Sequence, residues 1–253
     1  MAEPREYLLI SDLDDTLLGD DGALAEFVAF RESIADRVRI ELVYASGRFH
    51  DSIRRDIEQT LLPEPLAVIG GVGSQIVRHP DGTFVEGWKK RMSERWSAAR
   101  VREILSDEPE LEIQPEKDQS DFKVSYFARN ADEERLRHWK RKLRESGIHP
   151  RVVYSSNRDL DFLPEAVDKG TAAAFVAERL GFPPERVFVA GNSANDAALF
   201  EHGFRGIVVG NAHDELKILA EREDVYLSPL PIAAGVRDGI RHWLEQDEST
   251  KGN

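Results

Sequence analysis

Short apolar runs alternate with amphipathic segments in the first third of the chain, up to about residue 76. The apolar runs have the length and composition of buried strands: Tyr7–Ile10 and Ile40–Ala45. Segments 23–36 and 50–60 between and after them show the spacing of helices that cover a sheet. Because this alternation is typical of βαβ units, it predicts a parallel sheet with helices packed on it.

The same alternation returns in the last third of the chain. The expected strands are 186–190 and 206–209, and the expected helices are 171–180, 196–202, 214–221 and 236–246. The two parts therefore contribute to one α/β core.

Between about residues 84 and 162 the order changes to helix, strand, strand, helix, strand, strand. Trp96, Val101 and Leu105 fit one helix face, and Trp139 and Leu143 fit another. Two helices on one face of a small, mostly antiparallel sheet form an independent α+β unit. We therefore predict an α/β core made of residues 1–83 and 163–253, interrupted by an inserted cap at 84–162.

Composition narrows the possible functions. The 253 residues include 47 acidic and 34 basic side chains, and the net charge of −13 disfavours binding to nucleic acid or to an anionic membrane. The chain has no cysteine, which excludes disulfides and thiol catalysis. Neither a signal pattern nor an apolar run of membrane-spanning length is present, so we expect a cytoplasmic protein.

Asp12 and Asp14 stand one residue apart directly after the first apolar run. They would leave the carboxyl end of a strand together, where open α/β sheets bind ligands. Two carboxylates in one cleft repel each other unless a divalent cation neutralises them. In isolation the pattern would indicate only a turn rich in aspartate.

Three further polar clusters follow strand ends and change that interpretation. Ser46, Gly47 and Arg48 offer a hydroxyl, a flexible turn and a guanidinium suited to phosphate oxygens. Lys169 opens an alanine-rich helix, and segment 191–196 carries further oxygen ligands after another strand. Four such clusters at four strand ends predict one site for a metal and a phosphate.

In their order, these clusters resemble the four motifs of the haloacid dehalogenase superfamily of aspartyl phosphotransferases. The resemblance implies a haloacid dehalogenase-like Rossmannoid core with an inserted cap. Four longer segments are also similar to the sucrose-phosphatase family, including its mannosylfructose-phosphate phosphatase relatives: 69–74, 122–126, 154–164 and 205–212.

The resemblance implies a phosphatase that hydrolyses a sugar phosphate through an aspartyl-phosphate. Asp12 would be the nucleophile, Asp14 the general acid and base, and Lys169 the cation that screens Asp12. The residues expected to bind phosphate oxygens are Ser46, Gly47, Arg48 and Asn195. Sucrose 6-phosphate is the leading substrate and mannosylfructose phosphate the next, and a sucrose-phosphate-synthase-type glycosyltransferase is the implied partner.

The resemblance also implies Mg²⁺, held by the carboxylate of Asp12, the main-chain carbonyl of Asp14 and an acid of the fourth motif. Here Asn192 stands where the family usually has aspartate. An amide oxygen can bind Mg²⁺ without adding negative charge, so affinity should fall unless Asp196 compensates. A working, a weakened and an inactive protein remain open, and the intact remaining motifs favour activity.

Candidate sugar contacts lie mainly in the predicted cap. They are Lys123, Ser125 and Tyr126, with Gln75 and Asp161 as weaker candidates. Alternation does not say which side of the cap strand faces the core. A phosphomutase, a non-catalytic sugar-phosphate-binding partner of a glycosyltransferase and a receiver-like signalling domain remain alternatives, although the long insert argues against the last.

Overall fold

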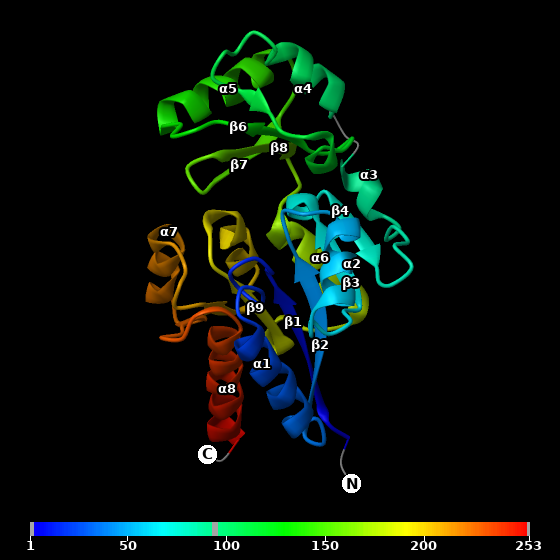
Figure 1. Ribbon diagram of the computed structural model, residues 1–253, viewed down its shortest axis with the longest axis vertical. Coiled ribbons are helices and arrows are strands. Elements are labelled where there is room, and N and C mark those ends of the chain that lie inside the picture. Colours follow the sequence, from blue (N-terminus) through cyan, green and yellow to red (C-terminus); the bar gives the residue numbers. More distant parts are fainter. Residues whose placement is uncertain (1–2, 93–95, 252–253) are drawn as a thin grey trace.

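The computed structural model describes residues 3–92 and 96–251 and arranges them around two sheets (Figure 1). The larger sheet has seven strands in the order β11-β10-β9-β1-β2-β3-β4, all parallel except β4. Its strands are β1 (Arg5–Ser11), β2 (Val38–Ala45), β3 (Ala67–Gly70), β4 (Gln75–Arg78), β9 (Val187–Gly191), β10 (Arg205–Val208) and β11 (Val225–Leu227). This arrangement confirms the predicted α/β class with a mostly parallel sheet.

Helices pack on this sheet in pairs. In Figure 1, α1 lies beside α8, and the two are in contact; α6 packs in the same way against the 3₁₀ helix η4. The elements are α1 (Asp21–Ile34), α2 (His50–Gln59), α6 (Lys169–Leu180), α7 (Asp214–Lys217) and α8 (Ile232–Lys251), with 3₁₀ helices η1 (Gly71–Gly73), η3 (Pro184–Arg186), η4 (Ala194–Glu201) and η5 (Ile218–Glu221).

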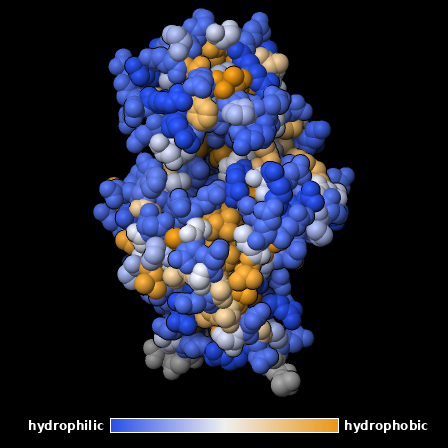
Figure 2. Space-filling view, viewed as in Figure 1, coloured by the Kyte–Doolittle hydropathy of each residue, from blue (hydrophilic) through white to orange (hydrophobic). Residues whose placement is uncertain are grey.

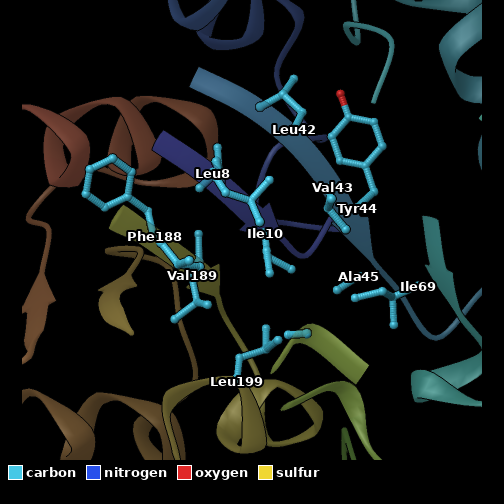
Figure 3. Packing of buried hydrophobic residues seen from close by; sticks show 14 of the residues in the cluster. Leu8, Ile10, Leu42, Val43, Tyr44, Ala45, Ile69, Phe188, Val189 and Leu199 are labelled. Carbon is cyan, nitrogen blue, oxygen red and sulfur yellow. The ribbon is translucent and has the colours of Figure 1, made fainter. Parts of the chain in front are cut away.

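The main core is built from the central strands. Leu8, Leu9 and Ile10 on β1 are all fully buried, as expected for a parallel strand covered on both faces. Figure 3 shows Leu8 and Ile10 between side chains of β2 and β9. This packing fixes the end of β1, from which Asp12 projects.

The structure differs from the sequence prediction at several elements. The expected alternation up to Ile76 ends instead in a hairpin, because the four residues between β3 and β4 are too few for a crossover to a parallel strand. Segment 196–202 was expected to be α-helical but forms η4, which ends at Glu201. Strand β11 is short and carried no sequence signal that we used, and α8 begins four residues earlier than expected.

The smaller sheet has four antiparallel strands in the order β5-β6-β8-β7. Its elements are α4 (Ala98–Ile104), β5 (Glu112–Ile113), η2 (Glu116–Asp118), β6 (Val124–Phe127), α5 (Glu133–Glu145), β7 (Pro150–Ser155) and β8 (Asp159–Pro164). Figure 1 shows α4 and α5 over the same side of this sheet. The order of elements agrees with the sequence prediction, and the unit has its own hydrophobic cluster, which includes Val101, Trp139 and Phe162.

The exact limits of the cap, 84 and 162, stay a prediction. Helix α3 (Trp88–Met92) follows the first limit, yet Trp88 and Met92 belong to the main hydrophobic core. The indole of Trp88 donates a hydrogen bond of 2.8 Å to the carbonyl oxygen of Gly73 and packs on Phe175. Among the described residues, the separate cluster of the cap begins at Ala98.

The surface agrees with the composition. Figure 2 shows a face on which hydrophilic residues dominate, with smaller hydrophobic areas between them. No helix formed by residues 3–92 and 96–251 combines the length and the apolar character needed to cross a membrane.

Candidate active site

Strand register brings the predicted site residues to one edge of the sheet. Ser11, the last residue of β1, pairs with Tyr44 on β2 and with Ala190 on β9. Because these strands are parallel, the segments that follow them leave the sheet side by side. Asp12, Ser46 and Asn192 are therefore close in space although they are far apart in the chain.

The ammonium of Lys169 is the centre of the site. It donates hydrogen bonds to Oδ1 of Asp12 at 2.8 Å, to Oδ1 of Asn195 at 3.0 Å and to Oδ1 of Asp196 at 2.6 Å. An ammonium has three protons, so its donors are fully used. The side chain is 0% exposed, and these three acceptors are what make burial of the charge tolerable.

Local sequence explains why Lys169 reaches these acceptors. It is the first residue of α6, whose start is fixed by a capping box between Asp168 and Thr171. The next residue, Gly170, packs against η4 so closely that a Cβ atom would lie 1.9 Å from the carbonyl oxygen of Ala198. Only glycine permits this approach.

Asp196 differs from its expected role as a metal ligand. It is fully buried, and while Oδ1 binds Lys169, Oδ2 accepts from the backbone amides of Asn192 at 3.0 Å and Ser193 at 3.1 Å. Gly191 leaves room for this carboxylate, since a Cβ atom there would lie 2.5 Å from the Cβ of Asp196. Both oxygens are therefore engaged in ordering the loop and in neutralising Lys169.

The pKa values of Asp12 and Lys169 are both shifted by burial and by the charges around them. Burial and the nearby charge of Asp196 raise the pKa of Asp12 to about 7, against the opposing effect of Lys169. Burial alone would lower the pKa of Lys169, but Asp12 and Asp196 outweigh it and raise that pKa, so the ammonium stays charged. One lysine thus faces two buried carboxyl groups, and the site is short of positive charge.

Asp14 is held by Arg48, which the sequence analysis assigned to phosphate binding. Its Oδ2 lies 2.9 Å from Nε of Arg48, and Nη1 of Arg48 donates to Asp56 on α2 at 2.6 Å. The backbone amide of Arg48 donates in turn to Oγ of Ser46, which is buried. Among the described residues, Nη2 of Arg48 is buried and has no hydrogen-bond partner.

A cavity of about 430 Å³, here called the catalytic cavity, joins these groups to the cap. It contains most of the predicted residues: Asp12, Asp14, Gly47, Arg48, Asn192, Asn195, Lys123 and Asp161. Its walls carry six aspartates but only three basic side chains, two arginines and Lys123. Ser46, Lys169 and Asp196 do not line the cavity and lie beneath the residues that do.

Strand alternation decides which cap residues face this cavity. Lys123, just before β6, and Asp161 on β8 point toward the core domain, with Nζ of Lys123 at 3.3 Å from Oδ1 of Asp161. Val124 and Phe162 point into the cap's own core. The lysine side chain is only 4% exposed, so it is held rigidly at the cavity wall.

Three expected sugar contacts are placed elsewhere. Tyr126 points the other way along β6, into the cap core, where its ring meets the edge of Phe162. Ser125 is buried and donates to Asp161 at 2.6 Å, so it positions that carboxylate without lining the cavity. Gln75 lines a different cavity and accepts from the backbone amide of His50 at 2.9 Å.

The cavity also includes residues that we did not predict: Asp15, Gln114, Asp118, Phe127, Ser155, Ser156, Arg158, Asp159, Ser193 and His213. Asp159 could have been found, because it shares a strand face with Asp161 under simple alternation. His213 could not, since its place depends on a hydrogen bond of 2.8 Å from its amide to the carbonyl oxygen of Asn192.

Replacing Lys169 by methionine should destabilise the protein strongly. The change keeps the volume but leaves Asp12 and Asp196 buried without a counter-charge, so we expect the free energy of unfolding at pH 7 to fall by about 3–5 kcal/mol. Urea denaturation followed by circular dichroism measures this. Lys217→Met, at a partly exposed lysine, is the control and should change stability by less than about 1 kcal/mol. Equal stabilities of the parent and Lys169→Met would contradict the central role of the ammonium.

The geometry of the site and the fold agree with comparisons to known proteins. The family model for sucrose-6F-phosphate phosphohydrolase matches residues 5–244. A mannosylfructose-phosphate phosphatase from Agrobacterium fabrum is 34% identical over 238 residues, which cover 93% of this chain and 96% of the relative. A probable sucrose-phosphatase from Arabidopsis thaliana is 28% identical over 85% of this chain, and the match spans 53% of that longer protein.

A solved structure supports the same assignment. The sucrose-phosphatase from Synechocystis, determined with sucrose and phosphate, superposes with a TM-score of 0.86 at 32% sequence identity, and the match covers 94% of this chain and 98% of that one. The likeness thus extends through both the core and the cap. The chain belongs to the sucrose-6F-phosphate phosphohydrolase family.

Proposed function

We propose that this protein is a Mg²⁺-dependent phosphatase that hydrolyses a disaccharide phosphate, with sucrose 6-phosphate as its first substrate. The observation that carries the proposal is the catalytic cavity, in which Asp12 and Asp14 of the core face Lys123 and Asp161 of the cap. A phosphate placed on Asp12 would leave its sugar against the cap wall.

Asp12 is suited to act as the nucleophile. Its carboxylate attacks phosphorus, an aspartyl-phosphate forms, and the bond from phosphorus to the sugar oxygen breaks. The hydrogen bond from Lys169 holds Oδ1, while Oδ2 receives only a weak contact of 3.3 Å from the hydroxyl of Thr16. The carboxylate is thereby oriented before substrate arrives, which lowers the entropic cost of attack.

Asp14 is suited to move the proton. In the first step it protonates the leaving sugar oxygen, and in the second it removes a proton from the water that attacks the aspartyl-phosphate. Its side chain is 60% exposed, and Arg48 holds it from the side of α2. Since Arg48 is itself paired with Asp56, the pair restricts Asp14 to the cavity wall.

The donor set fits Mg²⁺. In one cavity, Asp12 and Asp14 supply carboxylate or carbonyl oxygens and Asn192 supplies an amide oxygen. This small set is enough because Mg²⁺ prefers hard oxygen ligands, takes few of them from the protein and keeps several bound waters. The described residues contain no group of three or more histidine, cysteine or acidic side chains placed to hold a metal. In the proposed set, the third oxygen donor is the amide of Asn192 in the same cavity. When bound, Mg²⁺ neutralises the phosphoryl oxygens and the excess of carboxylates in the cavity.

Two substrates fit this proposal. Sucrose 6-phosphate is supported by the structural likeness to the Synechocystis enzyme, and mannosylfructose phosphate by the Agrobacterium relative, which is similar over nearly its whole length. The cap residues that face Asp12 would choose between them. The glycosyltransferase partner and the cytoplasmic location remain proposals based on the sequence.

Asp12→Asn should abolish phosphate release from sucrose 6-phosphate, because an amide is a poor nucleophile. We expect a loss of about a thousandfold or more in kcat. Asp15→Asn is the matched control, since Asp15 lines the same cavity but adopts a left-handed turn conformation that asparagine also tolerates. Activity of Asp12→Asn within about tenfold of the parent, a loss of only about 1.4 kcal/mol, would rule out this nucleophile.

Asn192→Asp should tighten Mg²⁺ binding by adding a negative charge at the presumed metal position. The half-saturating Mg²⁺ concentration should fall more than the KM for the sugar phosphate, while kcat should rise little or fall, because a better neutralised metal is a weaker Lewis acid. Magnesium titrations at equal ionic strength, with calorimetry of the protein without substrate, measure the effect. An unchanged magnesium dependence would remove Asn192 from the ligand set.

Lys123→Ala should reduce substrate selectivity more than it reduces the rate of phosphate hydrolysis. The KM for sucrose 6-phosphate should rise by about tenfold, while hydrolysis of a small aryl phosphate, which hardly reaches the cap, should change less than about threefold. Tyr126→Phe is the control on the same strand and should leave both substrates unaffected, because this ring lies in the cap core. If Lys123→Ala lost equal activity on both substrates, the residue would act in the catalytic step or in folding, and not in substrate selection.

A further inference from the structure

A second cavity, here called the side cavity, lies beside the catalytic cavity and shares none of its lining residues. Its volume of about 720 Å³ is in the range that holds small ligands. Four parts of the chain form it: helix α2 with the preceding Phe49, residues 74–75 at the start of β4, the segment 84–89 that runs into α3, and the cap segment 117–122. A ligand bound there would touch the core and the cap at once.

A contact between the two domains separates the cavities. The ammonium of Lys123, which faces the catalytic cavity, lies 5.6 Å from the centre of the Phe49 ring, which lines the side cavity. This cation–π contact forms a partition. A molecule in the side cavity therefore does not reach Asp12 in the conformation seen.

The walls combine aromatic faces with neutral polar groups. Phe49, Phe84 and Phe122 supply apolar surface, and Phe84 is 39% exposed without any ligand. Ser74 also lines this cavity; the residue is only 3% exposed, and its buried Oγ has no hydrogen-bond partner among the described residues. A buried polar atom without a partner is costly, so a ligand hydroxyl that reached this oxygen would satisfy it.

The charge of the side cavity indicates the class of ligand. Its walls carry three acidic and three basic side chains, in contrast to the acidic excess of the catalytic cavity. Serine and glutamine side chains supply most of the remaining polar groups. Balanced charge, neutral hydrogen-bonding groups and aromatic surface suit a molecule that has many hydroxyls and no charge.

We propose that the side cavity binds a neutral sugar and that the bound sugar links α2 to the cap. The site is additional to the proposed reaction, and only the choice of sucrose as probe rests on that reaction. Because the sugar would contact Phe49, the same ring that meets Lys123, its binding would favour the arrangement in which the cap lies against the core.

The test is equilibrium binding of sucrose to the full-length protein, measured by calorimetry and by saturation-transfer NMR without a phosphorylated substrate. Phe84→Ala should weaken binding by about tenfold or more, and Ser74→Ala by about fivefold. Leu61→Ala truncates another exposed apolar side chain outside the cavity and should have no effect. Asp161→Ala, in the catalytic cavity, should leave this binding in place.

The proposal is overturned if Phe84→Ala and Ser74→Ala both bind sucrose as tightly as the parent, or if Asp161→Ala abolishes all sucrose binding. Thermal melting of each variant verifies the fold, and the single-atom change Ser74→Ala keeps the test valid if Phe84→Ala does not fold. Since no turnover is measured, a failure of the proposed phosphatase reaction would appear separately, as absent phosphate release with sucrose binding intact.

Discussion

The buried ammonium of Lys169 is the interaction on which the rest of the site depends. It is the only described basic group within hydrogen-bond distance of Asp12, and it also neutralises Asp196, which in turn orders the loop that carries Asn192. Removing a charged group of this kind from water is tolerable only when all its donors are satisfied, and here they are. Close packing at Gly170 is the structural condition for this arrangement.

The remaining shortage of positive charge explains several features together. Six aspartates and three basic residues line a cavity whose proposed substrate is itself an anion. These carboxylates would repel a phosphate, and Asp12, Asp14 and Asn192 are the residues proposed to hold a cation that offsets the repulsion. With asparagine in place of an aspartate at position 192, the cavity carries one negative charge fewer, and we expect less electrostatic repulsion there at the expense of metal affinity.

In the proposed reaction, the cap would make the phosphate site selective for its substrate. Its β6 and β8 strands present one face to the catalytic cavity and the other to the cap's own core, so Lys123 and Asp161 are positioned by the packing of Val124 and Phe162 behind them. The same domain forms a wall of the side cavity through residues 117–122. Both cavities therefore depend on how the cap lies against α2.

The sequence alone determined the α/β class, and it predicted the inserted cap and the residues proposed for catalysis, because strand periodicity and polar residues at strand ends are local signals. It could not determine which face of β6 meets the core, and it therefore mistook Tyr126 for a sugar contact. Nor could it show that both carboxylate oxygens of Asp196 accept hydrogen bonds from Lys169 and two backbone amides, or that His213 reaches the cavity. Those facts depend on how separate elements pack against each other, and only the tertiary structure decided them.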